Sequence, residues 1–266
     1  MLLAIEDFSL AFRRYAGLTR QSLVTVLEGL GFAVARGEVV ALVGASGAGK
    51  SLLAHALFGI LPPNAVTSGR ILLDGAALDE RSWPSCRGRR MGLVPQSLSH
   101  LDPLVRCGRQ LAWAAARSGR ASSAAERLAL LARFELDPAI VRYFPHQLSG
   151  GMARRLMLAI ATIGAPDLVV ADEPTSGLDP RNARAVLGHL RGLADAGKGV
   201  LLITHDLVQC LPVADRVAIL RQGRLVGTEP AAAFAGDGAA LVSPYARALW
   251  RAMPENDFMG APLADA

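Results

Sequence analysis

The 266 residues are 52% hydrophobic, which suffices for one or two domains with a large core. The sequence has no run of 18 apolar residues, and acidic Glu6 and Asp7 interrupt its start, so we expect no transmembrane helix, no signal peptide and a cytoplasmic protein. The net charge of +5 permits an anionic partner, but no aromatic residues interleave with the one local arginine cluster, 87–90, so we expect no nucleic-acid partner.

The first 43 residues predict an antiparallel β region followed by a buried strand. Residues 3–12 and 23–32 are predicted strands, and the polar stretch 13–21 is a predicted loop between them. Residues 39–43, Val-Val-Ala-Leu-Val, form a short apolar run that is typical of a central parallel strand.

A phosphate-binding loop follows that strand directly. The pattern G-x-x-x-x-G-K-[ST] is matched at every fixed position, and a helix is predicted over residues 51–58. Backbone N–H groups of the glycine-rich turn and the helix N-terminus favour phosphate. The residues predicted to bind ATP here are Gly44, Ala45, Ser46, Gly47, Ala48, Gly49, Lys50 and Ser51, with Lys50 reaching the β- and γ-phosphates and Ser51 binding Mg²⁺.

The middle of the chain changes character. Residues 69–75 and 91–95 are predicted strands, and Gln96 stands at the end of the second one. From about 97 to 164, alanine, leucine and arginine dominate at helical spacing, which predicts an inserted helical subdomain. Within it, the Ser149-Gly150-Gly151 turn opens a predicted helix and is either a simple helix cap or a second phosphate-binding element.

Parallel-sheet character returns at residues 167–172. This apolar strand ends in Asp172 and Glu173, at the position where open α/β sheets bind ligands. Together with the phosphate loop, the pair predicts an Asp172 that holds Mg²⁺ through water and a Glu173 that orients and polarises the attacking water. His205 follows the next buried strand, 199–204, and is predicted to meet the γ-phosphate.

These motifs occur in one order, and the set resembles the nucleotide-binding subunit of ATP-binding-cassette (ABC) transporters over residues 3–230. The resemblance implies an α/β fold: an ABC-type phosphate-loop ATPase core with an antiparallel β subdomain and an inserted helical subdomain. It implies that Ser149, Gly150, Gly151 and Asp179 contact nucleotide, that Gln96, Glu173 and His205 are catalytic, and that Gln96 also binds the metal. Phe12 is the expected adenine-stacking residue, and Tyr15 is the alternative.

A finer resemblance is to the D-type ATPase of peptide and nickel importers, in which methionine follows Ser-Gly-Gly as Met152 does here. The short C-terminus makes the nickel-import D subunit the closest likeness, and without a cysteine after Cys210 we expect no iron–sulfur cluster. Arg154 and Arg155 lie where glutamine and arginine are usual in the family.

The resemblance implies an ATPase that powers import of peptides, nickel or metal–chelator complexes at the cytoplasmic face of the inner membrane. Its expected partners are two membrane-spanning permease subunits, an F-type cassette in a head-to-tail dimer and, indirectly, an extracytoplasmic binding protein. A soluble ABC ATPase acting on nucleic acid or ribosomes and an exporter subunit remain alternatives. Residues 1–240 are the expected nucleotide-binding domain, and 241–266 form a short helix and tail.

Overall fold

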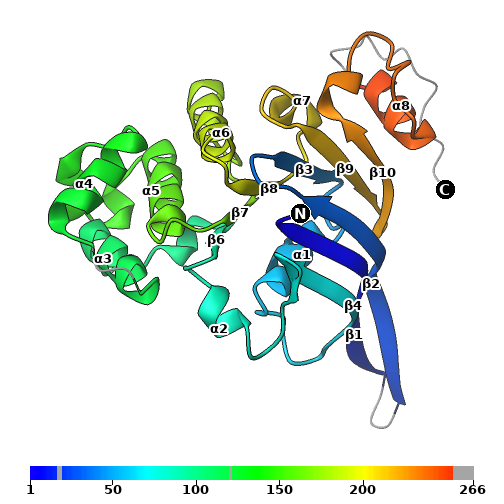
Figure 1. Ribbon diagram of the computed structural model, residues 1–266, viewed down its shortest axis with the longest axis horizontal. Coiled ribbons are helices and arrows are strands. Elements are labelled where there is room, and N and C mark those ends of the chain that lie inside the picture. The colour runs from blue at the N-terminus through cyan, green and yellow to red at the C-terminus, as the bar shows by residue number, and fades with distance from the viewer. Residues whose placement is uncertain (17–19, 120–121, 254–266) are drawn as a thin grey trace.

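The computed structural model describes residues 1–16, 20–119 and 122–253, without the side chains of residues 15, 16, 20 and 21. Two β-sheets organise the chain (Figure 1). The larger has six strands in the order β10-β9-β3-β8-β7-β6, and the smaller has four in the order β2-β1-β4-β5. The strands are β1 (Leu3–Ala16), β2 (Arg20–Val34), β3 (Val39–Gly44), β4 (Ala65–Leu73), β5 (Ala76–Ala77), β6 (Met91–Val94), β7 (Leu168–Asp172), β8 (Gly199–Thr204), β9 (Arg216–Arg221) and β10 (Arg224–Pro230).

The six-stranded sheet places the predicted motifs at one edge. Strands β3, β6, β7, β8 and β9 run parallel, with β3 paired to β8, β8 to β7 and β7 to β6. The segments that follow β3, β6, β7 and β8 therefore leave the sheet at the same edge. These segments carry the phosphate loop, Gln96, Glu173 and His205.

The central strand explains the layered core. Val39, Ala41 and Val43 of β3 pack in one apolar cluster, and Val40 and Leu42 pack in another. Successive side chains of a strand point to opposite faces, so a strand covered on both faces is apolar throughout.

Helix α1 (Lys50–Leu57) fills the space between the two sheets. Its Leu53 and Leu57 share a cluster with Leu3 and Leu27 of the four-stranded sheet and with Leu42 of β3. The start of α1 is thereby fixed at the end of β3 by packing on both sides.

Most other helices cover the face of the six-stranded sheet opposite α1, or lie beyond that face. Figure 1 shows α3, α4 and α5 together at one end and α8 beside β10 at the other. The helices are α2 (Trp83–Cys86), α3 (Cys107–Arg117), α4 (Ala124–Arg133), α5 (Gly150–Thr162), α6 (Pro180–Asp195), α7 (Leu207–Cys210) and α8 (Pro244–Arg251), with 3-10 turns η1 (Leu98–His100), η2 (Pro138–Arg142), η3 (Pro145–Gln147) and η4 (Ala231–Ala233). The domain boundaries given above stay predictions.

The predicted α/β class with an antiparallel part is confirmed, but the predicted loop over residues 13–21 is wrong for most of its length. Strand β1 continues to Ala16 and β2 begins at Arg20, with Arg13 opposite Leu23 and Arg14 opposite Ser22. Main-chain hydrogen bonds extend the two arms of this hairpin although Arg13, Arg14 and Ser22 are polar and exposed, so the side-chain pattern did not reveal them.

Candidate functional site

The eight residues of the phosphate loop form one tight turn that ends in the first residues of α1. Gly47 and Gly49 have φ values of +82° and +94°, which side chains rarely tolerate. A Cβ atom on Gly44 would lie 2.4 Å from the carbonyl oxygen of Leu220, so that glycine is required by close packing. Gly49 is the N-cap residue of α1, and no side chain caps this helix. The N–H groups of the first turn of α1 are therefore left for a ligand.

Lys50 lies folded onto its own loop. The residue is 6% exposed, and its Nζ atom donates hydrogen bonds to the carbonyl oxygens of Gly44 (2.6 Å) and Ala45 (3.0 Å). Burial lowers the pKa of Lys50, whereas the charges of Glu173 and Asp172 raise it. The ammonium group therefore stands at the loop with two carboxylates in its field, where phosphate oxygens would replace the carbonyls as acceptors.

Asp172 has the features of a cation ligand. It is 4% exposed, and its Oδ1 atom is buried without a hydrogen-bond partner. Burial raises the pKa of Asp172, and a hydrogen bond with Ser51 opposes that shift. A cavity of about 200 Å³ is lined by Ser51, Gln96 and Asp172 together. Carboxylate, hydroxyl and amide oxygens are the donors that Mg²⁺ prefers, so the predicted metal set fits a common space.

The same cavity reveals two residues that sequence reasoning missed. His55 and His100 also line it. His55 lies four residues after Ser51 on α1, so helical spacing alone could have placed it on the same face. His100 follows the strand that ends before Gln96, and no local pattern indicated it.

Glu173 and His205 are in direct contact. Nδ1 of His205 lies 2.8 and 2.9 Å from the two carboxylate oxygens of Glu173, which is 6% exposed. Glu173 has a φ of +48°, an uncommon value for a side chain of this size, and its N–H donates to the carbonyl of Ile203 (2.8 Å). The two predicted catalytic residues from β7 and β8 are thus brought together.

The Ser149 turn stands at the N-terminus of α5, and its Gly151 packs against Asn182 of α6. The Ser149 hydroxyl accepts the N–H of Met152 (3.3 Å) as the cap of α5. A Cβ atom on Gly151 would lie 2.5 Å from Oδ1 of Asn182, whose Nδ2 donates to Asp179 (2.5 Å). Among the described residues, no hydrogen bond or ion pair joins residues 149–151 to the phosphate loop.

Of the two candidates for adenine stacking, only Phe12 has a side chain within the described residues. Phe12 is half-buried and packs against the apolar cluster around α1. The side chain of Tyr15 lies outside the described residues.

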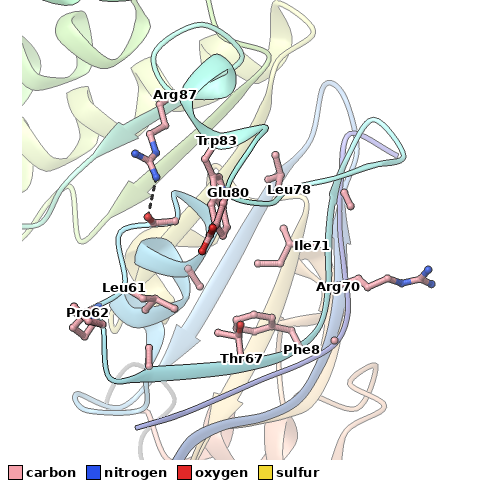
Figure 2. A pocket seen from close by; sticks show the side chains of 16 residues that line it. Phe8, Leu61, Pro62, Thr67, Arg70, Ile71, Leu78, Glu80, Trp83 and Arg87 are labelled. Carbon is pink, nitrogen blue, oxygen red and sulfur yellow. Dashed lines mark hydrogen bonds between the residues drawn. The ribbon is translucent and has the colours of Figure 1, made fainter. Parts of the chain in front are cut away.

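Two larger clefts lie away from the phosphate loop. One, of about 500 Å³, lies at the far end of α1, where Figure 2 shows Arg87 donating to the backbone oxygen of Gly59 and Trp83 beside it. The other, of about 590 Å³, is lined by residues that include Ile60, His100 and Trp113. Neither contains a residue of the phosphate loop. No helix in the described ranges combines the length and apolar character needed to cross a bilayer.

Comparison with known proteins agrees with this geometry. Residues 27–176 match the family model described as ABC transporter. The chain is 33% identical to the dipeptide transport ATP-binding protein DppD of Bacillus subtilis over 98% of its own length and 79% of that protein's. It is 37% identical to the oligopeptide transport ATP-binding protein OppD of Mycobacterium tuberculosis over 85% of its length, but it spans only 38% of that protein.

Solved structures show the same fold. An ATP-binding subunit of an ABC transporter superimposes with a TM-score of 0.70 at 32% identity, over 86% of this chain and 90% of that one. The cassette MJ0796 superimposes with a TM-score of 0.74 at 24% identity, over 86% of this chain and 99% of that one. With the motifs and the site geometry in agreement, the chain belongs to the ABC transporter family, as an ATP-binding cassette that hydrolyses ATP.

Proposed function

We propose that this cassette powers a peptide importer. The observation that carries the proposal is the assembly of the phosphate loop, Asp172, Glu173 and His205 at one sheet edge in a chain whose relatives are dipeptide and oligopeptide transport ATP-binding proteins. Nickel and metal–chelator complexes are the alternative cargo class.

The residues divide the chemistry among them. The N–H groups of residues 44–51 and Lys50 would hold the ATP phosphates. Ser51, Gln96 and Asp172 would hold Mg²⁺, which would neutralise developing charge on the phosphates. Glu173 orients the attacking water and takes up its proton. In the structure His205 occupies both Glu173 oxygens, so its hydrogen bond yields when water and γ-phosphate enter.

The larger exposed cleft is the proposed permease contact. It lies between β6, α3 and α5, and its lining includes Leu93 and Pro95 just before Gln96. Trp113, which lines the cleft, is 49% exposed, and Leu104, two residues after the lining residue Asp102, is 85% exposed. Exposed large apolar side chains around a concave surface are typical of a protein contact, and a permease helix at the membrane's cytoplasmic face is the proposed occupant.

A second cassette completes the assembly. The phosphate loop and the Ser149 turn each offer N–H groups to phosphate, but among the described residues no hydrogen bond or ion pair joins them. The turn therefore serves a nucleotide held by another cassette. Met152 supports pairing with an F-type cassette rather than with a second copy. The extracytoplasmic binding protein acts indirectly, through the permease.

Uptake of labelled dipeptide and of labelled nickel tests the cargo in membranes that contain the chain, its F-type partner and its permeases. We expect dipeptide uptake that Glu173→Gln abolishes and no nickel uptake; the reverse pattern would contradict the peptide assignment. Leu104→Asp and Trp113→Asp, which change the two exposed apolar side chains at this cleft, should each abolish uptake while basal ATPase stays within about twofold. Unchanged uptake in both variants would remove this cleft as the permease contact.

A further inference from the structure

Arg154 is a buried cation beside the ATP site that none of the assigned roles uses. It lies on α5 and is 5% exposed. Within the described part of the chain, no carboxylate oxygen lies within 4.0 Å of its nitrogens. Burial lowers the pKa of Arg154, and the charges of Asp172 and Glu173 oppose that effect. An arginine kept in such a place without an ion pair is costly for folding, so its presence calls for a function.

The guanidinium joins two loops of the site. Its Nη1 atom donates to the carbonyl of Pro95 (3.1 Å), the residue before Gln96. Its Nη2 atom donates a longer hydrogen bond to the carbonyl of Ser176 (3.5 Å), three residues before Asp179. The planar fork of arginine presents separate donors in fixed directions, so one side chain serves both loops.

The Ser176 contact leads to the catalytic carboxylate. The N–H of Ser176 donates to the carbonyl of Glu173 (3.2 Å), and Glu173 holds a φ of +48°. A residue with a side chain keeps this sparsely populated backbone conformation only where its surroundings fix it. Arg154 fixes the far side of that turn from α5.

We propose that Arg154 is a positioning residue: by bridging the carbonyls of Pro95 and Ser176 it holds the loops of Gln96 and Glu173 in register, and so sets the rate of ATP hydrolysis without binding ATP. The inference rests on the family's ATPase activity and is independent of the cargo.

Arg155 provides a matched control. It is the next residue on the same helix, and its side chain is 14% exposed. Its guanidinium donates to the carbonyls of Gly151 (3.3 Å) and Glu135 (3.0 Å) and lies 3.5 Å from the Glu135 carboxylate. Arg155 therefore carries the same charge on the same helix, but its hydrogen bonds go to Gly151 of its own helix and to Glu135, and none goes to the loops of Gln96 or Glu173.

The test compares Arg154→Met, which removes every N–H donor of the side chain, Arg154→Lys and Arg155→Met in the full chain. We expect both Arg154 variants to lose kcat about 10- to 100-fold, the scale of a displaced reacting group, with the Kd for ATP within about twofold of the parent. The lysine variant keeps the charge but lacks the fork, so it does not rescue kcat, and it remains usable should the neutral variant not fold. Arg155→Met should keep kcat within about twofold.

Amide hydrogen exchange separates positioning from a general structural role. In the folded Arg154 variants, exchange should speed up in residues 96–99 and 176–179 and stay unchanged in β3 and α1. A parent-like kcat in Arg154→Lys, or a parallel loss of ATP affinity and faster exchange throughout, would overturn the proposal.

Discussion

The phosphate loop and the Ser149 turn are both helix N-termini built on glycine, yet they are equipped very differently. At α1, the buried Lys50 of the helix lies in the field of the Asp172 and Glu173 carboxylates, and Glu173 contacts His205. These two carboxylates and His205 stand at the ends of β7 and β8, which are neighbours in one sheet. At α5, the Ser149 hydroxyl caps its own helix and both Ser149 and Gly150 are exposed. The first has the groups for chemistry, whereas the second has only N–H groups for an anion and open space for a partner to bring one.

This difference explains why a single chain is expected to bind ATP well and hydrolyse it slowly. The predicted catalytic groups lie together in one chain, but the proposed second phosphate contact is exposed at the start of α5. Each of the following changes acts on only one of the two helix ends.

The largest expected effect removes the carboxylate at the α1 end. Glu173→Gln should lower kcat by about 10²- to 10⁴-fold, because an amide cannot take up the proton of the attacking water, while ATP binding is retained. Phosphate release and equilibrium ATP binding measure the two quantities. Glu80→Gln, which changes an exposed carboxylate in the cleft of Figure 2, is the control. Hydrolysis at the parent rate in Glu173→Gln would show that Glu173 is not the base.

The next effect concerns affinity. Lys50→Ala removes a charge-assisted contact to phosphate, about 1.5–3 kcal/mol, and should raise the Kd for ATP about 10- to 150-fold. Titration with a fluorescent ATP analogue measures it. Lys198→Ala is the matched control, since Lys198 donates to Ala165 and lies 3.9 Å from Asp167, near the start of β7 and away from the phosphate loop. Equal affinity in the two variants would contradict the assignment of Lys50.

The smallest effect is placed at the α5 end. Aspartate is as good a helix cap as serine, so Ser149→Asp keeps α5 folded but puts a negative charge where the partner's phosphate would arrive. We expect ATP binding by the isolated chain to be unchanged and ATP-dependent pairing to weaken about tenfold, the effect of roughly 1.4 kcal/mol of repulsion. Ser149→Asn, a neutral cap of similar size, is the control. Should the two variants pair equally, the turn does not meet phosphate.

The same contrast shows what the sequence could predict. The phosphate loop, Asp172, Glu173 and His205 were predictable because each follows an apolar strand directly and parallel strands end at one edge. The bridge made by Arg154 could not be predicted from the sequence. Pro95 and Ser176 lie 59 and 22 residues from Arg154 in the chain, and they meet it only after α5 packs on the core. The long arms of the β1–β2 hairpin were missed because main-chain hydrogen bonds, and not an apolar side-chain pattern, hold the two strands together there.

The central claim is that one chain carries two incomplete halves of separate ATP sites. Sedimentation of the Glu173→Gln chain tests it, alone, with ATP and Mg²⁺, and with ATP and the F-type cassette. We expect a monomer without nucleotide, pairing on addition of ATP because the nucleotide contacts both halves, and the strongest pairing with the F-type cassette. A stable dimer without nucleotide, or a chain that stays monomeric with saturating ATP and the F-type cassette present, would contradict the account.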